Sequence, residues 1–373
     1  MNSELNMKIA ILTLPLHTNY GGILQCYALQ TVLERMGHKV QVLTKPQYGR
    51  SYYLIYPMAL FKRLFKRFVL GKKIAIFKAP YQIVRQHTDR FIQKYIHQYL
   101  RRKWTAKIAS RFDVIVVGSD QVWRPLYFRP IEEAFLSFLS DVNIKRVAYA
   151  ASFGVDYCEY TEEQREICSS LLKKFSAVSV RETSGIKLCQ EYFGIQAVQM
   201  LDPTLLLSTD DYRRVIKNNK THPSQGNMLV YMLDWTKDKE DLVEHIAKEK
   251  GLNPFWIDGD VDDENLPLEK RVKMPVEQWL RSFDDADFVL TDSFHGCVFS
   301  IIFSKQFLAM GNKERGLSRF YSLLSLFSLQ DRLILSSDEY KENLQLIDYD
   351  ELQSKLSILQ NQSISFFKIN FEK

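Results

Sequence analysis

The sequence predicts an α/β protein of two domains, and two observations lead to that prediction. Short apolar runs typical of strands alternate with amphipathic helical segments, a pattern that predicts parallel sheets covered by helices on both faces. The chain has 373 residues, and at roughly 100–200 residues per domain this length indicates two domains. The hydrophobic content of 46% and the charged content of 25% are ordinary for a globular protein.

The first domain is expected to span residues 1–215 and to begin with a strand, a glycine-containing loop, a helix and a second strand. This order predicts a right-handed βαβ unit. An irregular, aromatic and basic stretch at 50–105 then interrupts the alternation, and we interpret it as a helical insertion. The predicted strands are 8–13, 39–43, 113–118, 146–152, 177–180 and 197–201, and the predicted helices are 23–36, 161–175 and 184–193.

The second domain is expected to span residues 216–373 and to end in C-terminal helices. A polar stretch at 218–227 marks the junction, which we place between Asp202 and Asn227. The alternation of strands and helices is repeated in this half. Its predicted strands are 228–233, 254–257, 288–291 and 307–310, and its predicted helices are 239–250, 276–283, 297–303 and 317–326.

Composition limits the location and the possible ligands. The five cysteines are scattered and lack paired metal-ligand spacing, which favours free thiols in a reducing compartment and predicts no metal site. The start of the chain shows no secretory signal, and no apolar run approaches the roughly 18–20 residues of a membrane-spanning helix. We therefore expect a cytoplasmic protein, with peripheral contact at the inner membrane face as an open alternative.

The formal net charge of +6 is a local feature, because twelve Lys and Arg and no acidic residue lie between Glu34 and Asp89. Within residues 61–73 one predicted helical face is apolar and the other is basic. The apolar face carries Phe61, Leu64, Phe65 and Phe68, and the basic face carries Lys62, Arg63, Lys66 and Arg67. Such a helix can lie on an anionic membrane, or it can pack against the first domain. We expect no nucleic-acid binding, because no recognised motif accompanies the charge.

Two polar segments in the first domain follow predicted strands, where open α/β sheets place ligands. The loop with Asn19, Gly21 and Gly22 can present backbone N–H groups to an anion, although chain reversal alone also explains the two glycines. Asp120 and Gln121 follow the strand at 113–118 and can hydrogen-bond sugar hydroxyls.

Trp123 lies three residues after Asp120 and could stack on a sugar face, but it could equally be a core residue. Arg181 follows the strand at 177–180. Burying it unpaired would be costly, so we expect it either to pair with an acid such as Glu182 or to bind an anionic ligand.

The segment at 291–296 is the most specific candidate for chemistry. The strand at 288–291 leads through Asp292 and Ser293 to His295 and Gly296, just before an apolar helix. A histidine at such a strand tip suits proton transfer near neutral pH. After the next strand, three cations, Lys313, Arg315 and Arg319, could hold a phosphate and a carboxylate, or could be a solvated loop.

Six segments in this order resemble the polysaccharide pyruvyl transferase family. They are NYGGILQCYALQ (19–30), VGSDQVW (117–123), AYAASFG (148–154), SVRE (179–182), DPTL (202–205) and DSFHG (292–296). The resemblance covers about 8–330 and leaves the basic insertion outside. It implies two Rossmann-like domains facing a cleft, similar to the two-domain (GT-B-like) glycosyltransferase architecture.

The resemblance also implies an activity, which is transfer of pyruvyl from phosphoenolpyruvate to a sugar of a polysaccharide or lipid-linked glycan, giving a pyruvate ketal. Phosphoenolpyruvate is then a co-substrate, and no cofactor is expected. In the family, the histidine that matches His295 is linked to donor binding or catalysis. Many members carry arginine where this chain has Ser293, so Arg181, Lys313, Arg315 or Arg319 would supply that charge.

The sequence therefore predicts a division of roles. Proton transfer is assigned to His295, with Asp292 orienting it or acting as base. Donor binding is assigned to Arg181, Ser293, Gly296, Lys313, Arg315 and Arg319, and acceptor binding is assigned to Asn19, Gly21, Gly22, Asp120 and Gln121. A nucleotide-sugar glycosyltransferase of the same architecture and a non-catalytic glycan-binding protein are the alternatives.

Overall fold

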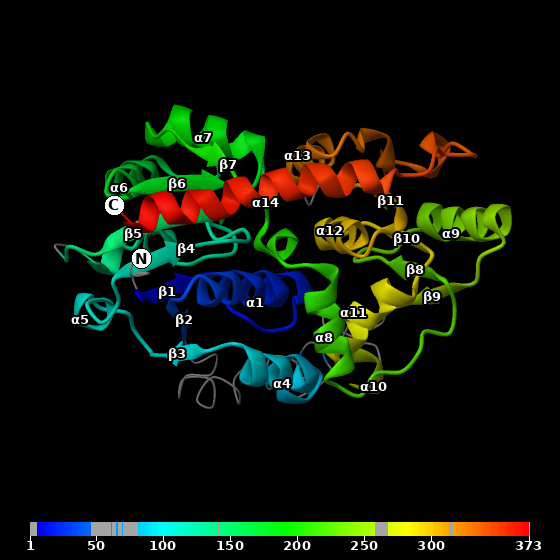
Figure 1. Ribbon diagram of the computed structural model, residues 1–373, viewed down its shortest axis with the longest axis horizontal. Helices are drawn as coiled ribbons and strands as arrows, with labels where there is room; N and C mark the ends of the chain where they lie inside the picture. The colour runs from blue at the N-terminus through cyan, green and yellow to red at the C-terminus, as the bar shows by residue number, and fades with distance from the viewer. Residues whose placement is uncertain are drawn as a thin grey trace.

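The computed structural model contains two parallel β-sheets covered by helices, one sheet in each half of the chain (Figure 1). It describes residues 6–45, 61, 65, 69, 81–139, 142–257, 268–312 and 316–372. The predicted α/β class with two Rossmann-like units is confirmed by this arrangement. Within the described ranges, no helix is both long enough and apolar enough to cross a membrane.

The first sheet has seven strands in the order β3-β2-β1-β4-β5-β6-β7, with every neighbouring pair parallel. The strands are β1 (Lys8–Leu12), β2 (Lys39–Thr44), β3 (Gln98–Leu100), β4 (Val114–Val117), β5 (Lys145–Ala151), β6 (Ala177–Val180) and β7 (Val198–Gln199). From β1 the chain moves outward to β3 and then returns to the other side of β1 at β4. The order of the strands therefore reverses between β1 and β4, the point at which doubly wound sheets bind ligands.

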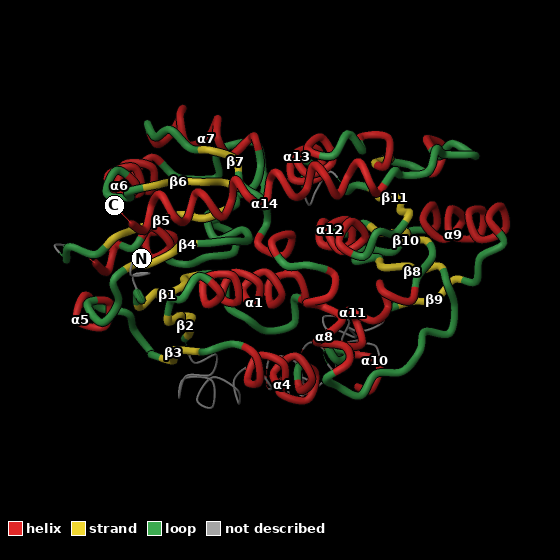
Figure 2. Tube along the Cα trace, viewed as in Figure 1, coloured by secondary structure: helices red, strands yellow, loops and turns green. Residues whose placement is uncertain are grey.

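Burial on both faces explains why these strands read as continuous apolar runs. Ile9 and Ile11 of β1 belong to one hydrophobic cluster, whereas Ala10 and Leu12 belong to the cluster on the opposite face. Helices cover the sheet on both sides (Figure 2). They are α1 (Tyr20–Arg35), α3 (Tyr81–Val84), α4 (Gln86–Tyr95), α5 (Ala106–Ala109), α6 (Glu162–Leu172) and α7 (Thr183–Phe193), with short 3₁₀ turns at Ile131–Phe135, Ser137–Leu139 and Pro203–Leu206.

The second sheet has five parallel strands in the order β12-β11-β10-β8-β9. Its strands are β8 (Met228–Tyr231), β9 (Pro254–Trp256), β10 (Phe288–Thr291), β11 (Gln306–Met310) and β12 (Leu333–Ile334). Its helices are α8 (Thr209–Lys217), α9 (Lys237–Lys250), α10 (Leu268–Arg271), α11 (Val276–Asp285), α12 (Phe294–Ile302) and α13 (Ser318–Leu326), and 3₁₀ turns lie at Gln330–Arg332 and Ser337–Glu339. The strand order reverses between β8 and β10, which gives this domain a switch point of its own.

Part of the stretch predicted as an insertion belongs to the first domain. β3 pairs with β2 at the edge of the first sheet, and Phe91 of α4 packs edge-on against Tyr27 of α1, with ring centroids 5.7 Å apart. The prediction of an insertion over 50–105 was therefore wrong for residues 86–100. Most of the basic segment 61–73 lies outside the described residues.

The predicted boundary at residues 215/216 falls inside α8, and the structure places this helix with the second domain. Arg213 Nη2 of α8 lies 2.9 Å from the Asp284 Oδ1 atom of α11. The C-terminal helix α14 (Tyr349–Glu372) runs from the second domain back over the first (Figure 1). Its Gln360 Nε2 donates to the Leu205 carbonyl at 2.6 Å, and its Phe367 ring lies 4.3 Å from that of Tyr149. The C-terminal segment is thus shared between the domains.

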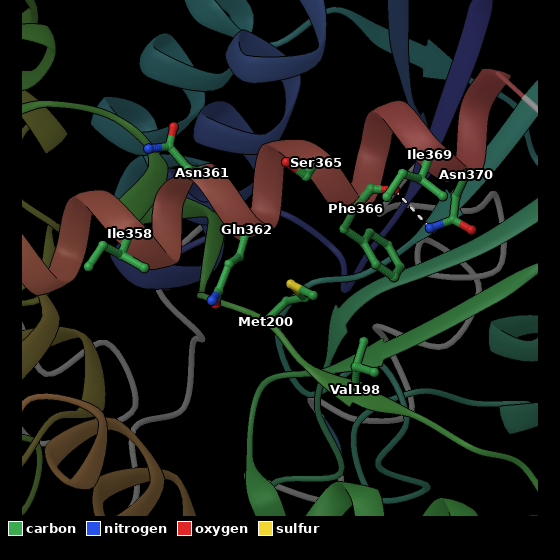
Figure 3. A pocket seen from close by; sticks show the side chains of 9 residues that line it. All are labelled: Val198, Met200, Ile358, Asn361, Gln362, Ser365, Phe366, Ile369 and Asn370. Atoms are coloured by element: carbon green, nitrogen blue, oxygen red, sulfur yellow. Dashed lines mark hydrogen bonds between the residues drawn. The ribbon is translucent and has the colours of Figure 1, made fainter.

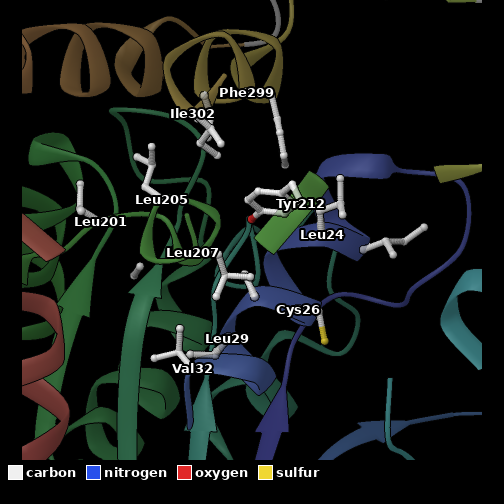
Figure 4. Packing of buried hydrophobic residues seen from close by; sticks show 14 of the residues in the cluster. Leu24, Cys26, Leu29, Val32, Leu201, Leu205, Leu207, Tyr212, Phe299 and Ile302 are labelled. Carbon is white, nitrogen blue, oxygen red and sulfur yellow. The ribbon is translucent and has the colours of Figure 1, made fainter. Parts of the chain in front are cut away.

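One apolar core continues from the first domain into the second (Figure 4). At the junction, Tyr212 of α8 packs against Phe299 of α12, with ring centroids 5.1 Å apart, and the same cluster includes Leu24 and Leu29 of α1. A large apolar interface of this kind limits relative motion of domains. The two switch points are therefore held in a defined relation to each other.

Candidate functional site

The two switch points meet where α1 approaches α12. Gly21 lies in the first turn of α1, and His295 lies in the first turn of α12. A Cβ atom on Gly21 would lie only 1.9 Å from His295 Nδ1. Glycine is therefore required at this position, because any side chain would overlap the imidazole.

His295 is 7% exposed and contacts the first domain through a second residue. Its Nε2 atom lies 3.7 Å from Asp202 Oδ2, too far for a hydrogen bond but close enough for strong electrostatic interaction. Among the described residues, Nε2 has no hydrogen-bond partner. Buried polar atoms are nearly always hydrogen-bonded, so this nitrogen is available to a ligand.

Asp202 follows β7 and is held as a carboxylate by its neighbours. Its Oδ1 accepts hydrogen bonds from the Thr204 backbone N–H and hydroxyl, and its Oδ2 accepts one from Arg181 Nη1 at 2.7 Å. Burial by itself raises the pKa of Asp202. Interaction with His295, and then with Arg181, outweighs burial and lowers this pKa below its ordinary value.

Arg181 follows β6 and is 4% exposed, among three carboxylates. Besides Asp202, its side chain lies 3.7 Å from Asp120 and 4.0 Å from Glu182. Burial lowers the pKa of the guanidinium, but the carboxylates more than compensate and raise it. Its Nε and Nη2 atoms are buried without a hydrogen-bond partner in the described part of the chain. The expected pairing with acids is present, and two donors are left for a ligand.

A second arginine lies beside the first. The guanidinium of Arg181 lies 4.5 Å from the centre of the Phe294 ring, and that of Arg319, in the first turn of α13, lies 5.5 Å from the same ring. Burial, and then the charge of Arg181, lowers the pKa of Arg319 to about 10, so it is still a cation at neutral pH. Lys313 and Arg315, the other two predicted donor ligands of this segment, lie outside the described residues.

Four helices begin at this cluster. Gly21 belongs to the first turn of α1, Glu182 is the N-cap of α7, His295 belongs to α12 and Arg319 to α13. Each of these helices has nine residues or more. Helix N-termini carry partial positive charge and unpaired N–H groups, so they favour anions. Together with the two arginines, they make this part of the interface suited to an anionic ligand.

Asp292 does not have the contacts that the sequence predicted for it. Its Oδ1 accepts a hydrogen bond from the Leu233 N–H at 2.6 Å, and its Oδ2 accepts from the Asp234 N–H at 3.0 Å and from Lys239 Nζ at 2.6 Å. The side chain is thus committed to the turn after β8. The carboxylate that faces His295 is Asp202, which the sequence analysis treated only as the end of a strand.

Ser293 and Gly296 flank His295 and shape the start of α12. Ser293 is its N-cap residue, and the Ser293 N–H donates to Thr291 Oγ1 at 3.0 Å. A Cβ atom on Gly296 would lie 2.2 Å from the same Thr291 oxygen. Gly296 therefore allows α12 to pack closely on β10. This packing explains the glycine without any contact between Gly296 and the donor substrate.

The predicted acceptor residues divide between two places. Asn19 caps α1, its Oδ1 accepting from the Gly22 N–H at 3.1 Å. A Cβ atom on Gly22 would lie 3.1 Å from Asp120 Oδ2, so Gly22 and Asp120 join Gly21 at the arginine and histidine cluster. Gln121 instead packs within the first domain, where its Oε1 accepts from Arg124 Nη1 at 3.4 Å and lies against Gly154.

Trp123 is a core residue, and the idea that it stacks on a sugar was wrong. Its side chain is fully buried and stacks on Phe135, with ring centroids 5.1 Å apart. Its indole N–H donates to the Ala134 carbonyl at 3.4 Å. The sequence could not decide this, because an aromatic residue after a buried strand fits both positions equally well.

Two hollows lie near Asp202. A small cavity between the domains is lined in part by Arg181, Asp202 and Phe294. A larger open groove of about 550 Å³ lies between β7 and α14, with Val198, Met200 and Ile358 among the side chains that line it (Figure 3). Met200 lines both, but none of the predicted site residues lines the groove. Arg181 and Asp202 are the charged side chains that line the interdomain cavity.

The fold defines a class of protein, that of two-domain α/β proteins with GT-B-like architecture. A putative UDP-N-acetylglucosamine 2-epimerase from Listeria monocytogenes has the same fold, with a TM-score of 0.53, 12% identity and coverage of 98% of this chain and 97% of that one. Similarity also extends to UDP-GlcNAc 2-epimerase from Neisseria meningitidis (TM-score 0.46, 11% identity, 98% and 94% covered) and UGT89C1 from Arabidopsis thaliana (TM-score 0.46, 10% identity, 96% and 95% covered).

Within this class the chain belongs to the polysaccharide pyruvyl transferase family, whose model matches residues 19–314. The protein is accordingly a transferase. The match begins at the N-cap of α1 and includes Arg181, Asp202 and His295. A search of curated protein sequences found no match.

Proposed function

We propose that the protein transfers the pyruvyl group of phosphoenolpyruvate to a sugar of a polysaccharide or lipid-linked glycan and so forms a pyruvate ketal. The observation that carries this proposal is the position of His295, a buried histidine between Gly21 and Asp202 and next to two arginines. Membership in the family supports it. The reaction needs a proton-transfer group beside an anion site, and in this cluster we assign the first role to His295 and the second to the arginines and helix N-termini.

The reaction forms two C–O bonds and one C–H bond. The methylene carbon of phosphoenolpyruvate gains a proton, which makes the adjacent carbon electrophilic, and a sugar hydroxyl attacks that carbon and loses its proton to the general base. Phosphate then leaves with the electrons of its C–O bond, and a second hydroxyl closes the ketal. Of the two hydroxyl protons, one replaces the proton given to the methylene carbon and the other goes to the released phosphate. A group that alternates as acid and base is therefore required next to the reacting carbon.

In this proposal His295 moves the proton and Asp202 positions it. The Asp202 carboxylate is held in place by hydrogen bonds from Thr204 and Arg181. It therefore keeps a negative charge 3.7 Å from His295 Nε2. This charge orients the ring and balances the charge that the imidazole acquires when it takes a proton. Asp202 thus takes over the orienting role that the sequence suggested for Asp292.

The donor phosphate and carboxylate would bind at the helix N-termini. The described part of the cluster holds two cations, Arg181 and Arg319, and three carboxylates, Asp120, Glu182 and Asp202. Formal charge alone is therefore insufficient for a multiply charged anion. We propose that the four helix dipoles, the unpaired Arg181 donors, and Lys313 and Arg315 from the segment before α13 complete the site.

The acceptor would approach from the first domain, past Asn19 and Gln121. Phosphoenolpyruvate acts as co-substrate, and the scheme uses no other cofactor. The glycan would be part of a capsule or exopolysaccharide that is assembled on the cytoplasmic side of a membrane.

The test is to incubate the protein with phosphoenolpyruvate and candidate lipid-linked glycans, following phosphate by ³¹P NMR and the glycan by mass spectrometry. The expected result is release of phosphate together with a glycan mass increase of one pyruvate less one water, absent with the His295→Ala variant. Parallel incubations contain UDP-sugars in place of phosphoenolpyruvate. Transfer of a sugar alone would show a glycosyltransferase, and no change to any compound across the glycan panel would contradict both activities.

A further inference from the structure

Two tyrosines beside the candidate site expose aromatic surface that the fold does not use. The side chains of Tyr127 and Tyr157 are 47% and 58% exposed, whereas nearby Trp123 and Phe128 are buried. Large exposed aromatic rings in a cluster mark interaction surfaces more often than stability determinants. The two tyrosines come from different loops of the first domain, so their proximity is a product of the fold.

A buried ion pair holds the two tyrosines in place. Arg124 is 5% exposed and makes a bidentate pair with Glu159, its Nε and Nη2 donating to the two carboxylate oxygens at 2.9 and 3.0 Å. The Arg124 guanidinium lies 4.9 Å from the centre of the Tyr127 ring, and the Tyr157 hydroxyl donates to Glu159 Oε1 at 3.5 Å. The pair is neutral as a whole, so the rings are fixed without a net charge beneath them.

A chain of close contacts leads from Tyr127 toward the start of α13. It begins with Arg124 Nη1, which donates to the Tyr127 hydroxyl at 3.4 Å. Gln121 Oε1 lies 3.4 Å from Arg124 Nη1. The same oxygen packs closely on Gly154, since a Cβ atom on Gly154 would lie only 1.9 Å from it. The Gly154 carbonyl in turn lies against Gly316, two residues before α13. A ligand on the tyrosines would therefore adjoin the anion site.

We propose that Tyr127 and Tyr157 form a binding platform for a pyranose ring of the acceptor glycan, an inference that rests on the proposed function. Sugars present flat faces of C–H groups that pack on aromatic rings, and hydroxyl edges that need hydrogen-bond partners. The tyrosine rings would pack on the C–H faces of the sugar. The Gln121 amide and the Glu159 carboxylate would form hydrogen bonds with its hydroxyls. This subsite takes the place that Trp123 was expected to occupy.

The kinetic test compares Tyr127→Ala and Tyr157→Ala with wild type. Each change should raise the acceptor KM by about tenfold, the size of one lost aromatic contact, and leave the phosphoenolpyruvate KM unchanged. Tyr127→Phe keeps the ring and should stay within about twofold of wild type. Trp256→Ala is the matched control, because Trp256 is also 47% exposed but lies on β9, at the edge of the second sheet.

A binding test separates this inference from the proposed function. Saturation-transfer NMR with methyl glycosides of glucose, galactose, mannose and their N-acetylamino analogues needs no turnover. At least one glycoside should bind wild type and Trp256→Ala, and its signal should be lost with Tyr127→Ala. If no glycoside binds, or if binding persists in both Tyr127→Ala and Tyr157→Ala, the two tyrosines do not form a sugar-binding platform. That conclusion holds regardless of which donor substrate the enzyme consumes. Glycoside binding that needs the tyrosines, without consumption of phosphoenolpyruvate, would overturn the proposed function alone.

Discussion

At the scale of single residues, the contact between Gly21 and His295 joins the two domains at the candidate site. A methyl group at position 21 would lie 1.9 Å from His295 Nδ1, so Gly21→Ala must displace the imidazole. Because a shift of about 1 Å in a reacting group can cost about 100-fold in rate, we expect a loss of that order in kcat. Steady-state kinetics will measure the loss, and circular dichroism will check that the fold is kept.

A double-variant comparison provides the control for this prediction. If Gly21 acts through His295, then Gly21→Ala should cause little further loss in a protein that already carries His295→Ala. A full additional loss in that background would mean that Gly21 acts by another route. Normal activity of Gly21→Ala would show that catalysis does not depend on the position of the His295 imidazole seen in the structure.

Asp202 provides a second prediction at this scale, which concerns acid stability. Its pKa is lower in the folded protein than in the unfolded chain because His295 and Arg181 outweigh the effect of burial. The stability it contributes is therefore complete above its ordinary pKa of about 4 and is lost as the pH falls from there toward the lower folded value. Asp202→Asn removes the pair with Arg181 and should cost roughly 3 kcal/mol at pH 7.

The measurement is urea unfolding of both proteins at pH 7 and at about pH 3. The difference in unfolding free energy between wild type and Asp202→Asn should shrink at the lower pH, since Asp202 takes up a proton there in the unfolded chain but not in the folded protein. Asp210→Asn is the control, because the Asp210 side chain is 84% exposed. This substitution should change the free energy of unfolding by no more than about 0.5 kcal/mol at either pH. If wild type and Asp202→Asn differ by the same unfolding free energy at both pH values, the pKa of Asp202 is not lowered in the folded protein.

At the scale of helices, the N-terminus of α8 connects the two domains. Ser208 and Asp211 form a capping box there, and the Asp211 carboxylate also accepts two hydrogen bonds from Arg35 of α1, at 2.6 and 2.9 Å. Burial raises the pKa of Asp211, but Arg35 and the Ser208 N–H outweigh it and lower the pKa. One carboxylate therefore both caps a helix and ties it to the neighbouring domain.

A double-mutant cycle of Arg35→Gln and Asp211→Asn measures this connection. We expect a coupling of about 1 kcal/mol in the free energy of unfolding, because Arg35 is half exposed and the pair is partly screened. Asp211→Asn alone should cost more than Arg35→Gln alone, since it also weakens the cap. Strictly additive effects would indicate that the helices pack independently of this ion pair.

At the scale of the whole molecule, the concentration of charge in residues 61–73 suggests a way in which the enzyme could meet the lipid-linked acceptor of the proposed function. We propose weak binding of this basic segment to anionic membranes, since each Lys or Arg near such a surface contributes about 1 kcal/mol. Changing Lys62, Arg63, Lys66 and Arg67 to Gln should abolish co-sedimentation with phosphatidylserine vesicles. Wild-type binding should fall at high salt and be negligible on neutral vesicles.

The competing interpretation is that the apolar face of this segment packs on the first domain. Of the residues concerned, the structure describes Phe61 and Phe65, whose side chains are 69% and 48% exposed. Equal and negligible sedimentation of wild type with both kinds of vesicle would contradict the membrane role. Thermal denaturation of the four-Gln variant, with an unchanged midpoint expected, shows whether the substitutions disturb the fold itself.

Local pattern predicted the elements well, because burial on both faces produces recognisable apolar runs. The strand at 113–118 is found as β4, and the helix predicted at 23–36 is found as α1, starting three residues earlier. That difference moves Gly21 and Gly22 from a loop into a helical turn. It arises because Asn19 caps the helix, a side-chain contact that hydrophobic periodicity does not report.

The sequence by itself determined the α/β class and the order of the motifs, and it singled out the segments that contain Arg181 and His295 as candidates. Only the tertiary structure decided that Asp202, and not Asp292, faces His295, that Trp123 is buried while Tyr127 is exposed, and that α14 returns to the first domain. The physical reason is the range of the interactions. Periodicity and capping act over a few residues, whereas the partners of a side chain at a strand end depend on how distant segments pack.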